Sequence, residues 1–274
     1  VCELMLLSHE SHDFFERVGE LTLRAPLLAA RVLSFANSAA SASSKPITSI
    51  EDALIRLGII KTLSLITVMS ISKIVPPSKP THKAIWSHSL ETAHLCKHLA
   101  ESVDDFSVDK ELAYLCGLLH DIGRFVLLQI SPKIIDVIDV HVWDKATELP
   151  GVENKLFGFT HADVGCLAAK KWSFPEIITQ VIQQHHRYNL WQINEESVEF
   201  RQLLTVVQLA DSISVFMHKN QGWQDWSETE LKDRITEECI HKNWPIINFK
   251  LDALISCMPK LQAECNEILK GMGI

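Results

Sequence analysis

The chain has 274 residues, of which 47% are hydrophobic and 22% are charged, and its formal net charge at pH 7 is −8. This balance is typical of a globular protein with a sizeable core and argues against a disordered chain. The acidic net charge also excludes a general binder of nucleic-acid backbones, because such a protein needs a basic surface.

The cysteines and the apolar segments indicate the compartment. Seven cysteines are scattered along the chain without a C-x-x-C pair, which is typical of core residues or free thiols in a reducing cytosol. The most apolar region, 53–75, carries Arg56, Lys61 and several serines, so we expect buried helices there rather than a membrane span. No signal peptide is recognised. We therefore expect a cytoplasmic protein without membrane association.

The apolar residues repeat with a helical period, which predicts an all-α, multi-helix bundle. Before residue 81 we expect a short helix over 24–41, a helix over 48–58, an apolar helix over 59–75 and a linker over 76–80. The second of these has Ser49 three positions before Asp52, a capping-box pattern, and Gly58 as a helix stop.

Further helices are predicted along the rest of the chain. We place them over about 82–103 and 109–120, from Thr160, from Pro175, and over about 200–217. Pro132 and Pro150 bracket one more helix, and 223–274 is predicted to form two or three amphipathic helices, one of them capped by Ser227.

Ionisable side chains interrupt the apolar faces of five of these segments. They are His88, His120, Asp121, His161, His185, His186 and Asp211. Each one alone is explained as a hydrogen-bonded core or helix-end residue. Together they lack charge partners nearby in sequence, and a buried unpaired ion costs several kcal/mol. His120 and Asp121 can both turn toward one point because Gly123 loosens the helix end.

A metal centre explains these residues together. Histidine and aspartate suit borderline divalent metals such as iron, manganese, nickel, cobalt or zinc. The set exceeds what one tetrahedral ion needs, so we predict one or two divalent ions, with Asp121 bridging a pair.

A second histidine pair is not expected to bind metal. His94 and His98, in "HLCKH", have the i, i+4 spacing of a zinc-binding helix but lack the glutamate that follows the first histidine in metalloproteases. We place both, with Glu91 and Glu101, on the solvated face of the 82–103 helix.

The order of the predicted ligands resembles the ligand series of the HD phosphohydrolase superfamily. Four segments are similar to the HDOD family, the HD-related output domain of bacterial signalling proteins: "ARVLSFANSA", "ITSIEDALIRLG", "LLHDIGR" and "FGFTHADVG". The likeness covers roughly 20–215. It implies an HD-like helical bundle with an additional N-terminal subdomain and a bacterial signalling role. Metal sites are often degraded in that family, whereas every matched ligand position is filled here.

The resemblance also sets the expected domains and one exclusion. We expect an N-terminal helical HDOD subdomain over 1–80, an HD-like core with the metal site over 81–220, and a C-terminal helical extension over 221–274, packed as one compact unit. The segment after His186, "RYNLWQIN", lacks the Asp-Gly…Gly-Tyr-Pro element of the related HD-GYP phosphodiesterases. Hydrolysis of cyclic di-GMP is therefore not predicted.

The sequence leaves two functions to weigh, and it favours the first, a bacterial signal-transduction domain, over the second. The first is a regulatory module that binds a protein signalling partner or a small phosphorylated ligand. The second is a metal-dependent phosphohydrolase acting on a phosphomonoester, a phosphodiester or a nucleotide. In that case the metals polarise a phosphoryl oxygen and activate a water, and Asp121 and Arg124 are the catalytic residues. Arg124 is expected to neutralise a phosphate oxygen of the substrate.

Overall fold

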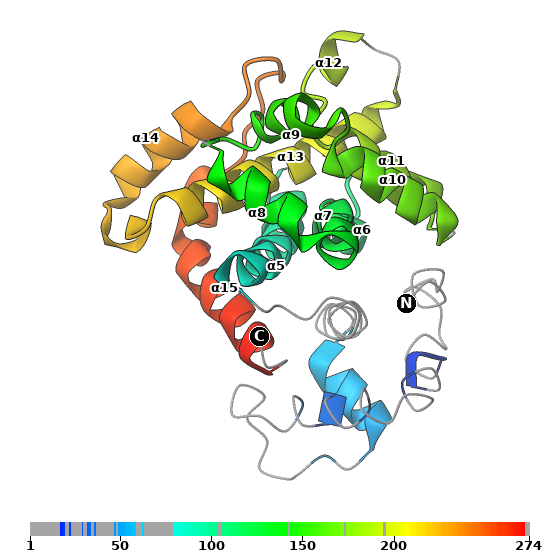
Figure 1. Ribbon diagram of the computed structural model, residues 1–274. Coiled ribbons are helices and arrows are strands. Elements are labelled where there is room, and N and C mark those ends of the chain that lie inside the picture. Colours follow the sequence, from blue (N-terminus) through cyan, green and yellow to red (C-terminus); the bar gives the residue numbers. More distant parts are fainter. Residues whose placement is uncertain are drawn as a thin grey trace.

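The computed structural model (Figure 1) describes residues 79–271, apart from 104, 105, 142, 173, 194 and 195; before residue 79 it describes 17–19, 22, 29, 32, 33, 36, 47, 49–58 and 62. No strand occurs among these residues, and the all-α prediction is confirmed. The labelled elements are α5 (Pro80–Ser102), α6 (Lys110–Leu119), α7 (Ile122–Ile130), α8 (Pro132–Val140), α9 (Leu149–Phe157), α10 (His161–Lys171), α11 (Glu176–Gln184), α12 (Leu190–Ile193), α13 (Val198–Lys219), the 3-10 helix η2 (Trp223–Asp225), α14 (Glu228–Cys239) and α15 (Leu251–Gly271).

The longest described helical run before α5 covers 50–58. It begins as predicted: the Ser49 hydroxyl oxygen accepts a hydrogen bond from the Asp52 backbone N–H at 3.0 Å. Gly58, the predicted stop, has a φ of 74°, in the left-handed region that is typical of a helix C-terminus. Most of the predicted helices over 24–41 and 59–75 and of the 76–80 linker lies outside the described residues, although the described residues 29, 32, 33, 36 and 62 are helical.

Helix α5 is the central helix of the described part of the chain. It packs against α6, α7, α13 and α15, and Figure 1 shows α15 running beside it. The predicted solvated face of this helix was therefore partly wrong. Glu101 is exposed, but His94 and His98 are only half-exposed and Glu91 is buried. The reason is that α13 and α15 both cover α5, so it has more than one buried face.

The "HDIG" segment forms the break between α6 and α7. His120 caps the C-terminus of α6, and Asp121 precedes the first residue of α7, so the helix end predicted near residue 120 is confirmed. Gly123 lets α7 approach α10 closely. A Cβ at this position would lie 1.9 Å from the carbonyl oxygen of His161. The missing side chain therefore brings Asp121 and His161 to one place.

The segment between residues 130 and 150 differs from its prediction. Helix α8 ends at Val140, and Pro150 lies in the first turn of the next helix, α9. Two helices are therefore present where one was expected. A proline within the first helical turn loses no internal hydrogen bond, so Pro150 helps to start α9 rather than ending α8.

Helix α10 begins as predicted. The Thr160 hydroxyl oxygen accepts from the backbone N–H of Asp163, and the Asp163 carboxylate accepts from the backbone N–H of Thr160, at 3.2 and 2.8 Å. This capping box fixes the first residue of α10, His161, in the first turn.

The C-terminal segment forms α14 and α15, and Ser227 caps α14 as predicted. Helix α14 packs on α13 and α15, and α15 packs on α5. The extension thus contacts the helices that carry the site. The division of the chain at residues 80 and 220 stays a prediction.

One described segment, Lys110–Ile130, is long and apolar enough to cross a membrane by length and composition alone. It comprises α6 and α7, and 83% of its most apolar window is buried inside the protein. Core helices pass the same test, so this is weak evidence for a membrane span.

We predict that Gly123→Ala destabilises the protein. The added methyl group overpacks the contact between α7 and α10, which costs about 1–3 kcal/mol or more. Chemical denaturation measures the loss. Gly151→Ala in α9 is the matched control, because no atom lies within 4 Å of its Cβ position, and it should leave the free energy of unfolding unchanged or slightly raised. Equal stability of both variants would contradict the close contact.

Candidate metal centre

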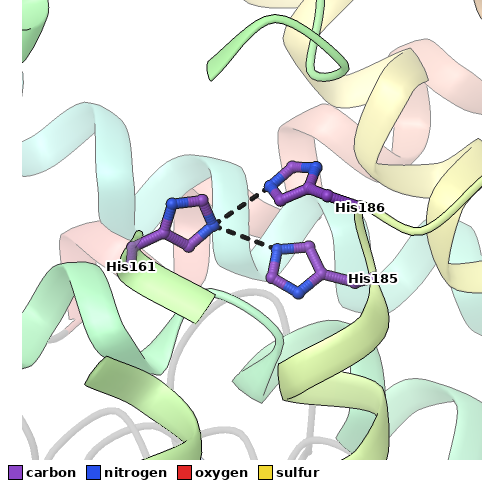
Figure 2. A group of neighbouring side chains, drawn as sticks. All are labelled: His161, His185 and His186. Atoms are coloured by element: carbon purple, nitrogen blue, oxygen red, sulfur yellow. Dashed lines mark hydrogen bonds between the residues drawn. The ribbon is translucent and has the colours of Figure 1, made fainter. Parts of the chain in front are cut away.

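Three histidines form the first cluster of the site (Figure 2). His161 is the first residue of α10, and His185 and His186 follow the last residue of α11. The Nε2 atom of His161 lies 3.1 Å from Nε2 of His185 and 3.1 Å from Nε2 of His186. His161 and His185 are fully buried and His186 is partly buried. Three imidazoles thus present the same ring atom to one point.

A second cluster joins α5, the end of α6 and α13. Its members are His88, His120 and Asp211, all buried. The Nε2 atom of His88 lies 3.2 Å from Nε2 of His120 and 3.3 Å from Oδ1 of Asp211. The Nε2 atom of His120 lies 3.9 Å from the same carboxylate oxygen.

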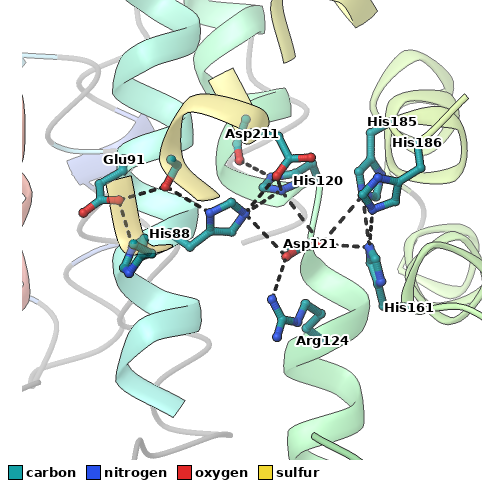
Figure 3. A network of polar contacts seen from close by, with 12 residues as sticks. His88, Glu91, His120, Asp121, Arg124, His161, His185, His186 and Asp211 are labelled. Atoms are coloured by element: carbon teal, nitrogen blue, oxygen red, sulfur yellow. Dashed lines mark hydrogen bonds and ion pairs between the residues drawn. The ribbon is translucent and has the colours of Figure 1, made fainter. Parts of the chain in front are cut away.

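Asp121 connects the two clusters, as Figure 3 shows. Its Oδ1 lies 3.0 Å from Nε2 of His161 and 3.7 Å from Nε2 of His185 in the first cluster. Its Oδ2 lies 3.7 Å from Nε2 of His88 in the second. The structure therefore brings all seven predicted ligands together, with Asp121 in the bridging position. Whether they hold metal is a proposal taken up below.

The outer ring nitrogens determine which atom faces the centre. Nδ1 of His120 lies 2.7 Å from the carbonyl oxygen of Gly117, and Nδ1 of His185 lies 2.8 Å from that of Ile182. A carbonyl oxygen only accepts, so each Nδ1 carries the proton. In the neutral ring, Nε2 is then an unprotonated acceptor. When two such Nε2 atoms face each other, their lone pairs repel unless a positive charge lies between them.

A buried glutamate that the sequence did not indicate orients His161. Glu153, on α9, accepts hydrogen bonds from the backbone N–H of His161 at 2.9 Å and from its Nδ1 at 2.7 Å. The Glu153 side chain is 2% exposed. Metal-binding histidines commonly donate the distal N–H to such a carboxylate, which fixes the tautomer and raises ligand basicity.

His88 has a comparable support that runs through a serine. Its Nδ1 lies 3.0 Å from the Ser214 hydroxyl oxygen, and that hydroxyl donates to Oε2 of Glu91 at 2.8 Å. The same Oε2 lies 2.9 Å from Nε2 of His218. Glu91, expected on the solvated face, is instead the end of a buried relay to a candidate ligand. Burial opposes its ionisation, but His218 and Ser214 outweigh that effect and lower the pKa of Glu91.

The two central carboxylates are held ionised. Burial by itself favours their protonated forms, yet His161 and His120 outweigh it and hold the pKa of Asp121 well below its usual range. The pKa of Asp211 is lowered in the same way by His88 and His120.

The pKa values of two histidines in the first cluster shift in opposite directions. Burial opposes protonation of His161, but the carboxylates of Glu153 and Asp121 outweigh it and raise the pKa of His161 to about 10. Burial and the neighbouring His120 lower the pKa of His185 to about 3. In the metal-free chain a proton on His161 therefore supplies the positive charge that the facing lone pairs and carboxylates need.

The residues present fit a divalent cation. One buried carboxylate oxygen of the site, Oδ2 of Asp211, has no hydrogen-bond partner. The donors are imidazole nitrogens and carboxylate oxygens, the set that borderline divalent metals prefer. The donor atoms form three groups of three, and within each group they lie within 4.8 Å of one another. The groups are His161, His185 and His186; His88, His120 and Asp211; and His120, Asp121 and His185.

Arg124 lies at the edge of this centre. One guanidinium nitrogen is 3.6 Å from Oδ2 of Asp121, and the side chain is 7% exposed. With His88 it lines a cavity of about 410 Å³. A small ligand in this cavity therefore reaches a candidate metal ligand and a guanidinium together. His94 and His98 belong to none of the three donor groups.

We predict that Glu153→Gln weakens metal binding about 10–100-fold, as the loss of a carboxylate behind a histidine ligand typically does. Competition with a chromophoric chelator measures the affinity. The exposed Glu267→Gln on α15 is the control and should bind as the wild type does. An unchanged affinity of the Glu153 variant would show that this carboxylate does not support a ligand.

Two curated proteins resemble parts of the chain. A stretch of 186 residues is 23% identical to an uncharacterized protein of Treponema pallidum (strain Nichols). A stretch of 106 residues is 31% identical to Ribonuclease Y of Mycoplasma genitalium. These matches cover 68% and 39% of this chain but only 35% and 16% of the relatives. The chain thus spans about a third or less of the length of these relatives.

Solved structures share the fold over almost the whole chain. An HDOD domain protein of unknown function from Geobacter sulfurreducens has a TM-score of 0.67 and 23% identity, over 97% of this chain and 89% of that one. A "Putative phosphohydrolase" from Shewanella amazonensis SB2B has a TM-score of 0.66 and 24% identity, over 98% of this chain and 92% of that one. A "Putative signal transduction protein" from Marinobacter aquaeolei VT8 has a TM-score of 0.68 and 20% identity, over 97% of this chain and 57% of that one.

The predicted family is confirmed by the pattern of the HDOD domain itself. That pattern matches residues 1–188, more than half of the chain, and the match includes six of the seven site residues, all but Asp211. The chain therefore belongs to the HDOD domain family.

Proposed function

We propose that this protein is a divalent-metal-dependent phosphohydrolase. The observation that carries the proposal is the convergence of five histidine Nε2 atoms and the carboxylate of Asp211 around Asp121, beside a cavity that Arg124 lines. The ions, one or two, would be held by His88, His120, Asp121, His161, His185, His186 and Asp211. The Shewanella neighbour and the ribonuclease relative, by their names, act on phosphoesters, which supports this chemistry.

Each part of the site then has a role. A bound divalent ion supplies Lewis acidity and lowers the pKa of a coordinated water. Asp121 lies between the clusters and would contribute its carboxylate to ions held on either side. Arg124 contacts Asp121 and lines the cavity, where its guanidinium would bind a phosphate oxygen. Loading the site also releases protons, because His161 is protonated in the metal-free chain.

A regulatory module in a bacterial signalling protein is the second candidate. HDOD membership supports it, as does the Marinobacter neighbour, of which this chain covers only 57%. In this case the centre stabilises the fold or senses a small phosphorylated ligand, and a protein partner receives the signal. We propose a cytoplasmic location for either function, because seven scattered cysteines are typical of free thiols in a reducing compartment.

We predict that the purified protein, supplied with Mn²⁺ or Fe²⁺, retains one or two metal ions per chain and hydrolyses bis-p-nitrophenyl phosphate or p-nitrophenyl phosphate. Asp121→Ala removes the bridging carboxylate and should lower both metal content and turnover by at least about tenfold. Elemental analysis and release of p-nitrophenol measure the two effects.

Asp252→Asn is the control, since Asp252 pairs with Lys232 on the exposed surface of the C-terminal helices. It should retain metal and activity. Metal without turnover of either ester would favour the regulatory module over the hydrolase. A chain that retains no metal would refute both the metal centre and the hydrolase.

A further inference from the structure

The cavity beside the candidate metal centre is lined by basic side chains, whereas the chain as a whole is acidic. Among the described residues that line it are Arg124, Lys219 and two histidines, His88 and His218, and no aspartate or glutamate. The whole chain, by contrast, has 34 acidic against 26 basic residues. The neighbouring cavity, of about 300 Å³, is lined by three carboxylates, Asp144, Glu237 and Glu238, and by two lysines, Lys145 and Lys242. The described lining of the first cavity is therefore positive, whereas acidic and basic side chains are mixed in its neighbour.

Two of these cations make cation–π contacts with the same tryptophan. The indole ring of Trp143 has the guanidinium carbon of Arg124 at 6.0 Å and the ammonium of Lys219 at 4.2 Å from its centroid. Lys219 also donates a hydrogen bond to the backbone carbonyl of Trp143. Cation–π contacts stabilise each side chain in this place. The two permanent charges are thus held near one ring before any ligand arrives.

The ion pair of Lys219 is weak, and Arg124 contacts a candidate metal ligand. Lys219 lies 4.0 Å from Asp144, but the Asp144 side chain is 74% exposed and its field is screened by solvent. Arg124 faces Asp121, a predicted metal ligand whose charge a cation compensates. Arg124 and Lys219 both line the cavity, and none of its described lining residues is a carboxylate, so both cations attract an anion that enters it.

Part of the cavity wall is apolar. Ala84 and Ile85 of α5, Val215 of α13 and the indole of Trp143 contribute to it. Its volume of about 410 Å³ is at the small end for organic ligands. The cavity therefore suits one charged group at the metal side, with a compact flat or apolar body against the wall.

We propose that this cavity is the substrate site and that it takes a small organic phosphate monoester, whose dianionic group lies between Arg124 and Lys219. This deepens the proposed function and rests on it for the reaction, whereas anion binding does not depend on turnover. A diester carries one charge rather than two and a second substituent, so it gains less from the paired cations and needs more space. In hydrolysis, water attacks phosphorus, the ester oxygen leaves as the alcohol or phenol after taking up a proton, and inorganic phosphate is released.

The test measures inorganic phosphate binding to the Mn²⁺-supplied protein by calorimetry. Lys219→Met keeps the apolar stem and removes the charge, and should weaken phosphate binding about tenfold or more, with unchanged metal content. Lys219→Arg should retain most of the affinity. Lys232→Met is the matched control, since Lys232 forms its ion pair with Asp252 away from the cavity, and it should bind phosphate as the wild type does.

A second variant and a substrate pair complete the test. Trp143→Leu removes the ring that gathers the cations and should also weaken phosphate binding without loss of metal. Wild type should prefer p-nitrophenyl phosphate to the bis ester by kcat/KM, and Lys219→Met should reduce that preference.

Metal binding together with equal phosphate affinity in wild type and Lys219→Met would overturn this site but leave the metal centre standing. Preference for the diester would overturn the substrate class. If the protein retains no metal but still binds phosphate in a way that depends on Lys219, the proposed function would be refuted and the anion site supported.

Discussion

Everything in this structure that bears on function depends on one electrostatic constraint. Buried carboxylates and the unprotonated nitrogens of several imidazoles point at the same small volume. Lone pairs and negative charges cannot be packed face to face in a low-dielectric interior without a positive charge among them. In the metal-free chain, protonation of His161 provides part of that charge. A divalent cation provides more of it, through atoms that already face inward.

The fold meets this constraint by fixing ring orientation from outside. Main-chain carbonyl oxygens hold Nδ1 of His120 and His185, and buried glutamates hold His161 directly and His88 through Ser214. Helices α7 and α10 meet at Gly123, where a side chain would not fit. Positions far apart in sequence thus converge because both the helix contacts and the outer hydrogen bonds specify them. Such support is what makes a ligand set preorganised rather than merely close.

The sequence predicted the inner residues because a charged group on an apolar helical face is a local signal. His88 and Asp211 stand out in this way, and the capping box at Thr160 located His161. The outer residues carry no such signal. Glu91 was assigned to solvent, since the pattern of α5 alone does not reveal that α13 and α15 cover it. Glu153 and the pairing of Lys219 with Trp143 arise only from tertiary contacts. Pro150 could end one helix or start another, and the sequence did not decide between them.

The cavity beside the centre connects the buried chemistry with the outside of the protein. Arg124 lies beside Asp121, which joins the two clusters (Figure 3), and it lines the cavity together with Lys219. A ligand in this cavity is therefore within reach of His88 and Arg124. Both hydrolysis and sensing of a phosphorylated ligand use this arrangement, and they differ in whether the bound phosphoester is turned over.

The most direct measurement is anomalous X-ray diffraction from crystals of the protein grown with Mn²⁺, collected above and below the manganese edge. One or two peaks are expected among the Nε2 atoms of the five histidines, next to the carboxylates of Asp121 and Asp211. The absence of any peak there, with the same side chains bridged by water alone, would contradict a metal centre in this protein.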